Sequence, residues 1–219
     1  MNVHAVRSAG WSGIAFIVVV FISAFAPGVP PDLSATPAAI GAFFDAHRTL
    51  LILAGWLGFP AGAFFLWFAV GLYGFLRSAR DSSDALPTFA LAAGIAATAI
   101  AFASSAIQVA LAVHPSADLG PQVVRIFYDF SLVTGTLLWA PIGLFMFAVA
   151  YSGLRHGSMP PLLGWFGYIT AILCGVASLT VLWTTGPLAL GGLGALVLGV
   201  APLTLWTIAT GVVMIRHNA

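Results

Sequence analysis

Polar side chains at the edges of long apolar runs are the residues of this chain best suited to chemistry. Charges beside hydrocarbon are costly to keep, so they merit a functional hypothesis. Two arginines could bind an anionic headgroup or a carboxylate, and a histidine beside them could exchange protons. One interpretation is therefore a small polar binding pocket. Its candidate residues are Asp45, His47, Arg48, His114, Arg125, Tyr128 and Asp129.

The spacing of these charges supports a second, simpler interpretation. Asp45 and Arg48 are three residues apart, and Arg125 and Asp129 are four apart. Side chains at either spacing can meet on one face of a helix. An aspartate near a helix N-terminus is also stabilised by the helix dipole. We therefore favour local ion pairs that close helix ends over a shared binding pocket.

Nucleophilic and metal-dependent catalysis find little support in the sequence. The chain has no Gly-x-Ser-x-Gly motif, and without a glutamate it cannot have a His-Glu-x-x-His motif. The single cysteine, Cys174, allows neither an intrachain disulfide nor a zinc cluster. We predict no catalytic residue, no metal and no cofactor.

Haem held between facing histidines is a further possibility for a helical membrane protein. The histidines of this chain lie at or beyond the ends of the apolar runs and not a turn or two inside them. Solvated imidazoles at a membrane surface explain this placement better than haem ligands do. The five residues are His4, His47, His114, His156 and His217.

The composition requires that these residues be positioned by membrane helices. Of the 219 residues, 61% are apolar and 6% are charged, and the mean hydropathy is +1.07. Soluble domains carry about 25% charged residues. The chain has no clustered positive charge, which excludes a nucleic-acid partner. The sequence therefore predicts an all-α integral membrane protein whose first partner is the lipid bilayer.

Charged and turn residues divide the chain into six apolar stretches, each long enough for a helix that crosses a bilayer. Thr184 to Pro187 and the glycines at 191 and 192 separate the last two stretches. The chain then forms a single transmembrane domain, residues 1–219. The expected spans lie near residues 9–27, 49–76, 86–113, 130–154, 162–183 and 190–215.

The distribution of arginines predicts the orientation, because positively charged loops remain in the cytoplasm. With the N-terminus inside, five arginines are cytoplasmic and only Arg48 and Arg125 are outside. We therefore expect a multi-pass inner-membrane protein with both termini cytoplasmic. Two proline-containing segments, 28–47 and 114–129, then face outward as irregular loops or short interfacial helices. The cytoplasmic arginines are Arg7, Arg77, Arg80, Arg155 and Arg216.

Small residues are expected to bring the helices together, because close packing drives helix association in lipid. The third stretch carries such residues at four-residue spacing, and the second and sixth carry glycines at similar spacing. Gln108 is the one amide deep in a span, and we expect it to make an interhelical hydrogen bond. The small residues are Gly58 and Gly62, then Ala93, Ala97, Ala101 and Ser105, then Gly191, Ala195 and Gly199.

Prolines in the second, fourth and sixth stretches predict helix kinks at a similar depth. Pro60, Pro141 and Pro202 are each followed by an arginine at the predicted cytoplasmic end of the same helix. The motifs that begin at Gly10 and Gly164 also open the first and fifth stretches in a similar way. This pattern suggests a weak repeat of three helical hairpins, although general rules of membrane helices would also produce it.

The segment from Tyr151 to Trp165, with the sequence YSGLRHGSMPPLLGW, carries a resemblance. It resembles the inner loop of small bacterial six-span integral membrane proteins that are grouped under a domain of unknown function. In those proteins a span ends in Arg, Gly and Pro form the turn, and Leu-Gly-Trp opens the next span. The resemblance implies the six-span fold. It implies no activity and no functional residue.

These observations favour a non-catalytic binding or accessory subunit in the membrane, because no catalytic constellation is found. Its partner would be another membrane protein subunit or an anionic lipid. The alternative is a small transporter or lipid-handling protein with a polar site at the outer face. An enzyme or a haem protein ranks third.

Overall fold

The computed structural model describes residues 3–78, 85–186, 188–190, 192, 194 and 196–216. These residues form helices and connecting turns, with no strand among them. Six helices are long and apolar enough to cross a membrane. The predicted all-α architecture with six candidate spans is therefore confirmed. Arg80, Pro187, Gly191, Ala195 and His217, on which some expectations rested, lie outside the described residues.

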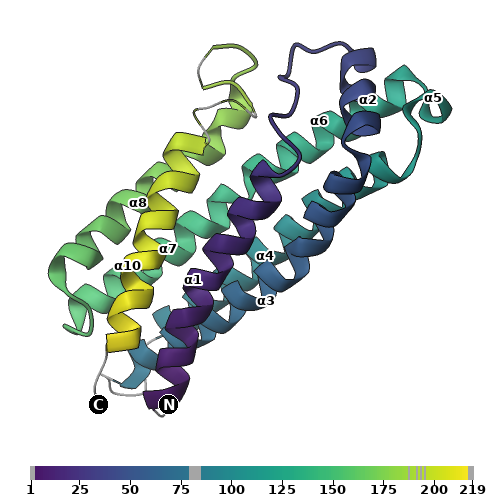
Figure 1. Cartoon of the computed structure of the whole chain (residues 1–219). Helices are drawn as coiled ribbons and strands as arrows, with labels where there is room; N and C mark the ends of the chain where they lie inside the picture. Colours follow the sequence, from purple (N-terminus) through teal and green to yellow (C-terminus); the bar gives the residue numbers. More distant parts are fainter. Residues whose placement is uncertain are drawn as a thin grey trace.

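Long helices alternate with short connections along the described chain (Figure 1). Two short helices, α2 and α5, occupy the connections before α3 and before α6. The elements are α1 (Val3–Phe25), α2 (Pro37–Ala46), α3 (Arg48–Ser78), α4 (Leu86–Val113), α5 (Ser116–Leu119), α6 (Pro121–Leu137), α7 (Trp139–Arg155), α8 (Pro161–Leu179), the 3-10 turn η1 (Thr180–Leu182), the π-helix η2 (Leu196–Val200) and α10 (Ala201–Arg216).

The fourth candidate span is longer than predicted. It runs through α6 and α7, Pro121–Arg155, whereas the expected span began near residue 130. Residues 121–129 are thus helical and not part of an outward loop, because Pro121 occupies a first-turn position that needs no backbone N–H. Gly120 permits the turn before it with a φ of 74°.

The other outward segment contains a short helix, as the proline pattern allowed. The Thr36 side chain accepts a hydrogen bond from the Ala39 N–H at 3.3 Å, and Pro37 starts α2. This helix ends at Ala46, and α3 begins at Arg48 after a turn at His47. Asp45 and Arg48 therefore lie on different helices.

The long helices pack as neighbours in a bundle. α1 contacts α3 and α10, α4 contacts α3, α6 and α7, and α8 contacts α7 and α10. The start of α1 and the end of α10 lie at one end of the bundle, and α2 and α5 lie at the other (Figure 1). We call these the termini end and the cap end. The cap consists of residues 26–47, α5 and the first turns of α6.

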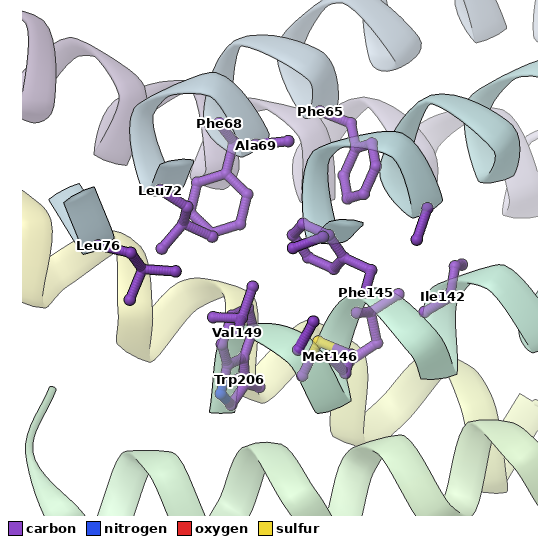
Figure 2. Close-up of a cluster of buried hydrophobic side chains, with 14 of the residues drawn as sticks. Phe65, Phe68, Ala69, Leu72, Leu76, Ile142, Phe145, Met146, Val149 and Trp206 are labelled. Carbon is purple, nitrogen blue, oxygen red and sulfur yellow. The ribbon is translucent and has the colours of Figure 1, made fainter. Parts of the chain in front are cut away.

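Buried apolar side chains form two separate clusters. The larger one joins α1, α3, α4, α7, α8 and α10, and Figure 2 shows part of it. There Phe68 and Leu72 of α3 point toward Val149 of α7 and Trp206 of α10. The smaller cluster holds the cap on the bundle. It contains Ile40, Phe44, Leu51, Leu111, Ala112, Val124 and Tyr128.

Small residues lie where the helices approach most closely. Ala93 and Ala97 are buried in the larger cluster, so the predicted small face of α4 points into the bundle. On α3, a Cβ added at Gly62 would lie 2.5 Å from the Phe102 ring of α4. Glycine at this position therefore allows the two helices to pack with an aromatic ring between them.

Helical hydrogen bonding is altered one turn before two of the three prolines. The boundary between α6 and α7 falls at Leu138, before Pro141, and η2 directly precedes α10, which contains Pro202. Proline lacks an N–H and its ring displaces the carbonyl four residues earlier, which accounts for both interruptions. α3 continues through Pro60 without a change of helix type.

Candidate functional site

The Arg125 guanidinium binds two segments of the cap together. Its Nε donates to Asp129 Oδ2 at 2.8 Å, which confirms the predicted pair on one helix face. Its Nη1 donates to the Ala35 carbonyl at 3.0 Å, and its Nη2 donates to the Leu33 carbonyl at 2.7 Å. All three nitrogens of this arginine are therefore occupied by the protein.

Tyr128 and Asp129 complete this contact with the chain that follows α1. The Tyr128 hydroxyl donates to the Pro31 carbonyl, and its ring is buried against Phe44 of α2. The second carboxylate oxygen of Asp129, Oδ1, is buried and has no hydrogen-bond partner among the described residues. Arg125, Tyr128 and Asp129, which lie within about one turn of α6, thus position the irregular chain above them.

Asp45 and Arg48 do not form the pair that their spacing predicted. Asp45 instead accepts hydrogen bonds from the Ser116 N–H at 3.1 Å and from the Ser116 hydroxyl at 2.5 Å. These bonds hold the pKa of Asp45 below its ordinary value of 3.8, and the positive charge of Arg48 adds to the effect. Arg48 donates to the Val113 carbonyl at the C-terminus of α4, where the helix dipole stabilises a positive charge.

The two histidines of the predicted site lie apart from any ligand-binding geometry. His47 follows α2, and its Nδ1 lies 3.0 Å from the Phe43 carbonyl, with the ring against Phe43. His114 follows the last residue of α4 and is exposed.

The structure therefore gathers the predicted polar residues at the cap end, but it uses them to fasten the cap. Both Arg48 and Arg125 donate to backbone carbonyls, and neither lines the two cavities described below. The favoured interpretation, local ion pairs that close helix ends, applies to the Arg125–Asp129 pair. It does not apply to Arg48, which donates to the Val113 carbonyl. Asp45 and Tyr128 reach across to other segments, which sequence spacing could not show.

A cavity of about 220 Å³ lies beneath this cap. Its polar lining comes from Ser23, Gln108, Tyr128 and Ser131, which belong to α1, α4 and α6. We call it the cap cavity. Its remaining lining residues are Ala24, Pro27, Gly28, Pro30, Phe43, Phe44, Leu51, Ala54 and Leu132.

A second cavity of about 260 Å³, which we call the chamber, lies deeper between α1, α3, α4, α7 and α10. Its walls are almost entirely apolar. The neighbours of all three candidate kink prolines line it: Gly58 and Ala61 beside Pro60, Trp139 and Ile142 beside Pro141, and Val200 and Leu203 beside Pro202.

The cap cavity and the chamber adjoin each other. Ser23 lines both. On α3, Ala54 of the cap cavity is one turn from Gly58 of the chamber, and on α4, Gln108 is one turn from Ser105. The two spaces are therefore stacked along the same helices, with the polar one nearer the cap.

Gln108 is the residue of this site that sequence reasoning placed but misinterpreted. An interhelical hydrogen bond was expected, yet its side chain has no hydrogen-bond partner within the described part of the chain and instead lines the cap cavity. The interhelical bond in this region comes from Ser104, whose hydroxyl donates to the Ser131 carbonyl at 3.1 Å. An amide in an apolar run was the available signal.

Other chemistry gains no support from the arrangement. Across the residues that the structure describes, no three histidine, cysteine or acidic side chains are grouped to hold a metal ion. No histidine lines the cap cavity or the chamber.

In comparisons with known proteins, no family, no curated protein and no solved structure matches this chain.

Proposed function

We propose that this chain is a non-catalytic, multi-pass membrane protein that binds a lipid-like amphiphile. The observation that supports this function is the stacking of the cap cavity, which has four polar residues in its lining, on the almost entirely apolar chamber. An amphiphile has a headgroup that seeks hydrogen bonds and a tail that seeks apolar contacts. A site with the same two halves in the same order is complementary to it.

The proposal corresponds to the lipid-handling alternative predicted from the sequence, at a set of residues that shares Tyr128 with the predicted one. The expected anion site at Arg48 and Arg125 receives less support, because both guanidinium groups already donate to carbonyls. Ligand binding is assigned instead to Gln108 and the walls of the chamber. Of the residues first predicted, Tyr128 also lines the cap cavity, and Asp45, Arg48 and Arg125 hold the cap above it.

Orientation and location form part of the proposal. We place the protein in the inner membrane of a bacterium, with both termini in the cytoplasm and the cap outside. The distribution of the described arginines supports this orientation, since Arg7, Arg77, Arg155 and Arg216 belong to helix ends at the termini end, whereas Arg48 and Arg125 belong to the cap end. The ligand would then bind in the outer half of the bilayer.

The repeat of three hairpins also remains a proposal, with one further pattern in its favour. Arg77 lies over the Tyr73 ring at 5.4 Å from its centroid, and Arg155 lies over the Tyr151 ring at 5.8 Å. The second and fourth candidate spans thus end in the same cation–π pair, four residues apart. Both spans also carry a proline whose sequence neighbours line the chamber.

A partner subunit in the membrane stays a prediction. Copurification of a second protein at constant stoichiometry in mild detergent would support an accessory role for this chain. The amphiphile proposal does not depend on it, because both cavities are lined by this chain alone.

Filling the chamber tests the proposed function. Ala101 lines the chamber, whereas Ala103, on the same helix, is exposed on the lipid-facing side. We expect the wild-type protein and Ala103→Leu to copurify with the same amphiphile, detected by mass spectrometry of extracted lipids. Ala101→Leu should lose most of it while remaining monodisperse. Equal retention by both variants would contradict the proposal.

A further inference from the structure

We infer that the cap cavity selects an uncharged headgroup, a hydroxyl on a single alkyl chain, with Gln108 as its hydrogen-bonding partner. This inference rests on the proposed function and names the class of amphiphile. It follows from the inventory of donors, acceptors and charges around the cap cavity.

The hydroxyl groups that line the cap cavity have already used their protons. Tyr128 donates to the Pro31 carbonyl. Ser131 donates to the Tyr128 carbonyl at 2.8 Å, and Ser23 donates to the Val20 carbonyl at 3.0 Å. Each hydroxyl therefore offers only lone pairs to a ligand. A headgroup that brings its own proton can donate to them.

Gln108 supplies the complementary groups. Its amide carries two N–H donors and one carbonyl acceptor, and it has no partner within the described residues. A ligand hydroxyl can accept from the amide nitrogen and donate to a protein oxygen at the same time. The cavity thus offers both halves of the hydrogen bonding that an alcohol requires.

An anionic headgroup finds no such match. No charged side chain lines the cap cavity or the chamber. The arginine of α6, Arg125, donates from each of its three nitrogens, to Asp129, Ala35 and Leu33. A carboxylate or a phosphate would face the lone pairs of three hydroxyls and would lose its hydration without a counter-ion, which is costly.

The chamber limits the ligand to a narrow tail. Its volume of about 260 Å³ lies below the range of roughly 300–1,000 Å³ for sites of drug-sized ligands. One alkyl chain suits this space better than the two chains of a phospholipid. Trp139 lines the chamber, so its fluorescence can report a tail that enters.

A matched pair of probes tests the inference on the full-length protein in mild detergent. The probes are a dodecanol and a dodecanoate, each brominated at the tail end, at an alkaline pH where the acid is ionised. Bromine quenches tryptophan on contact. The measured quantity is the saturable quenching present in the wild type and absent in Trp139→Phe, which removes the contribution of the lipid-facing tryptophans.

We expect the brominated alcohol to quench Trp139 saturably and at lower concentration than the acid. Gln108→Leu should weaken the binding of the alcohol about five- to tenfold, which corresponds to the loss of one or two hydrogen bonds. Gln122→Leu, which changes the exposed glutamine of α6, should leave binding unchanged. Thermal unfolding of each variant verifies that it is folded.

The other outcomes separate the two claims. Equal or tighter binding of the acid, or equal binding by Gln108→Leu, would overturn the assignment of an uncharged headgroup while amphiphile binding stands. If neither probe quenches Trp139 saturably, the chamber does not accept a tail, and the proposed function fails together with the inference.

Discussion

Gly10 of α1 and Gly211 of α10 bring their two helix backbones into direct contact. A Cβ added at Gly10 would lie 2.6 Å from the Gly211 carbonyl oxygen, and one added at Gly211 would lie 2.8 Å from the Gly10 carbonyl oxygen. Real Cβ atoms essentially never approach an atom this closely. Glycine at both positions therefore permits the first and last spans to cross as they do.

Gly211→Ala should destabilise the bundle by about 1–3 kcal/mol, because the added methyl group meets rigid backbone and must push the helices apart. Thermal unfolding in detergent measures the effect. Gly175→Ala is the matched control, since a Cβ at Gly175 of α8 has no neighbouring atom within 4 Å. A loss of stability for both variants alike would show that the crossing of α1 and α10 is not the cause.

Arg125→Ala should release the chain between α1 and α2. The variant loses the charge-assisted bonds to the Leu33 and Ala35 carbonyls and leaves Asp129 without its partner. We expect the cap to be destabilised by about 2 kcal/mol. Arg125→Lys should restore little of this lost stability, because a single ammonium group cannot donate to both carbonyls in the fork geometry of a guanidinium group. Faster proteolysis within residues 26–36, with the spans intact, would be the readout.

Acid should loosen the contact between α2 and α5. The folded-state pKa of Asp45 is lowered, so its contribution to stability is complete above the unfolded value of about 4 and is lost as the pH falls through the folded value. Hydrogen exchange of α2 should therefore accelerate below about pH 4. The exchange profile across this range measures the effect.

Ser116→Ala isolates this contribution. It removes the side-chain bond that lowers the pKa of Asp45 most, so exchange of α2 should be faster near neutral pH and should change less on acidification. Asp32, whose pKa is lowered by Ser34, is unchanged in this variant. An acid response identical to that of the wild type would exclude Asp45 as its source.

Cysteine labelling tests the proposed orientation. In a Cys174→Ala background, Val29→Cys places a thiol on the cap, where Val29 is 90% exposed, and Arg216→Cys places one at the termini end. A maleimide that cannot cross membranes should label only Val29→Cys in intact cells. Both should react after permeabilisation. Labelling of Arg216→Cys alone in intact cells would reverse the topology.

The number of spans followed from the sequence because apolar length is a local property. Each of the six helices required only a long run with few charges, and α4 begins and ends at the predicted residues 86 and 113. The start of α6 was missed for the same reason. Residues 121–129 contain Arg125 and Asp129, so hydropathy excluded a segment that forms a helix through its proline start and its ion pair.

The candidate site depended on contacts between distant segments, and these were not predictable. The spacing of Asp45 and Arg48 predicts a pair only if one helix contains both, and the turn at His47 separates them. Asp45 instead accepts a hydrogen bond from Ser116, which is 71 residues away in the sequence. Predicting the cavities would also have required knowing which helices are neighbours. The sequence of a single span does not contain that information.

Because the buried side chains separate into two clusters, we expect two cooperative units stacked along the axis of the molecule. The smaller cluster joins the short helix α2 to the cap-end residues of α3, α4 and α6, so we expect local opening there before the larger cluster opens. Such an opening uncovers Gln108 while the long helices stay packed. Entry to the interior then requires only local unfolding at the water boundary, and no helix has to slide through the hydrocarbon.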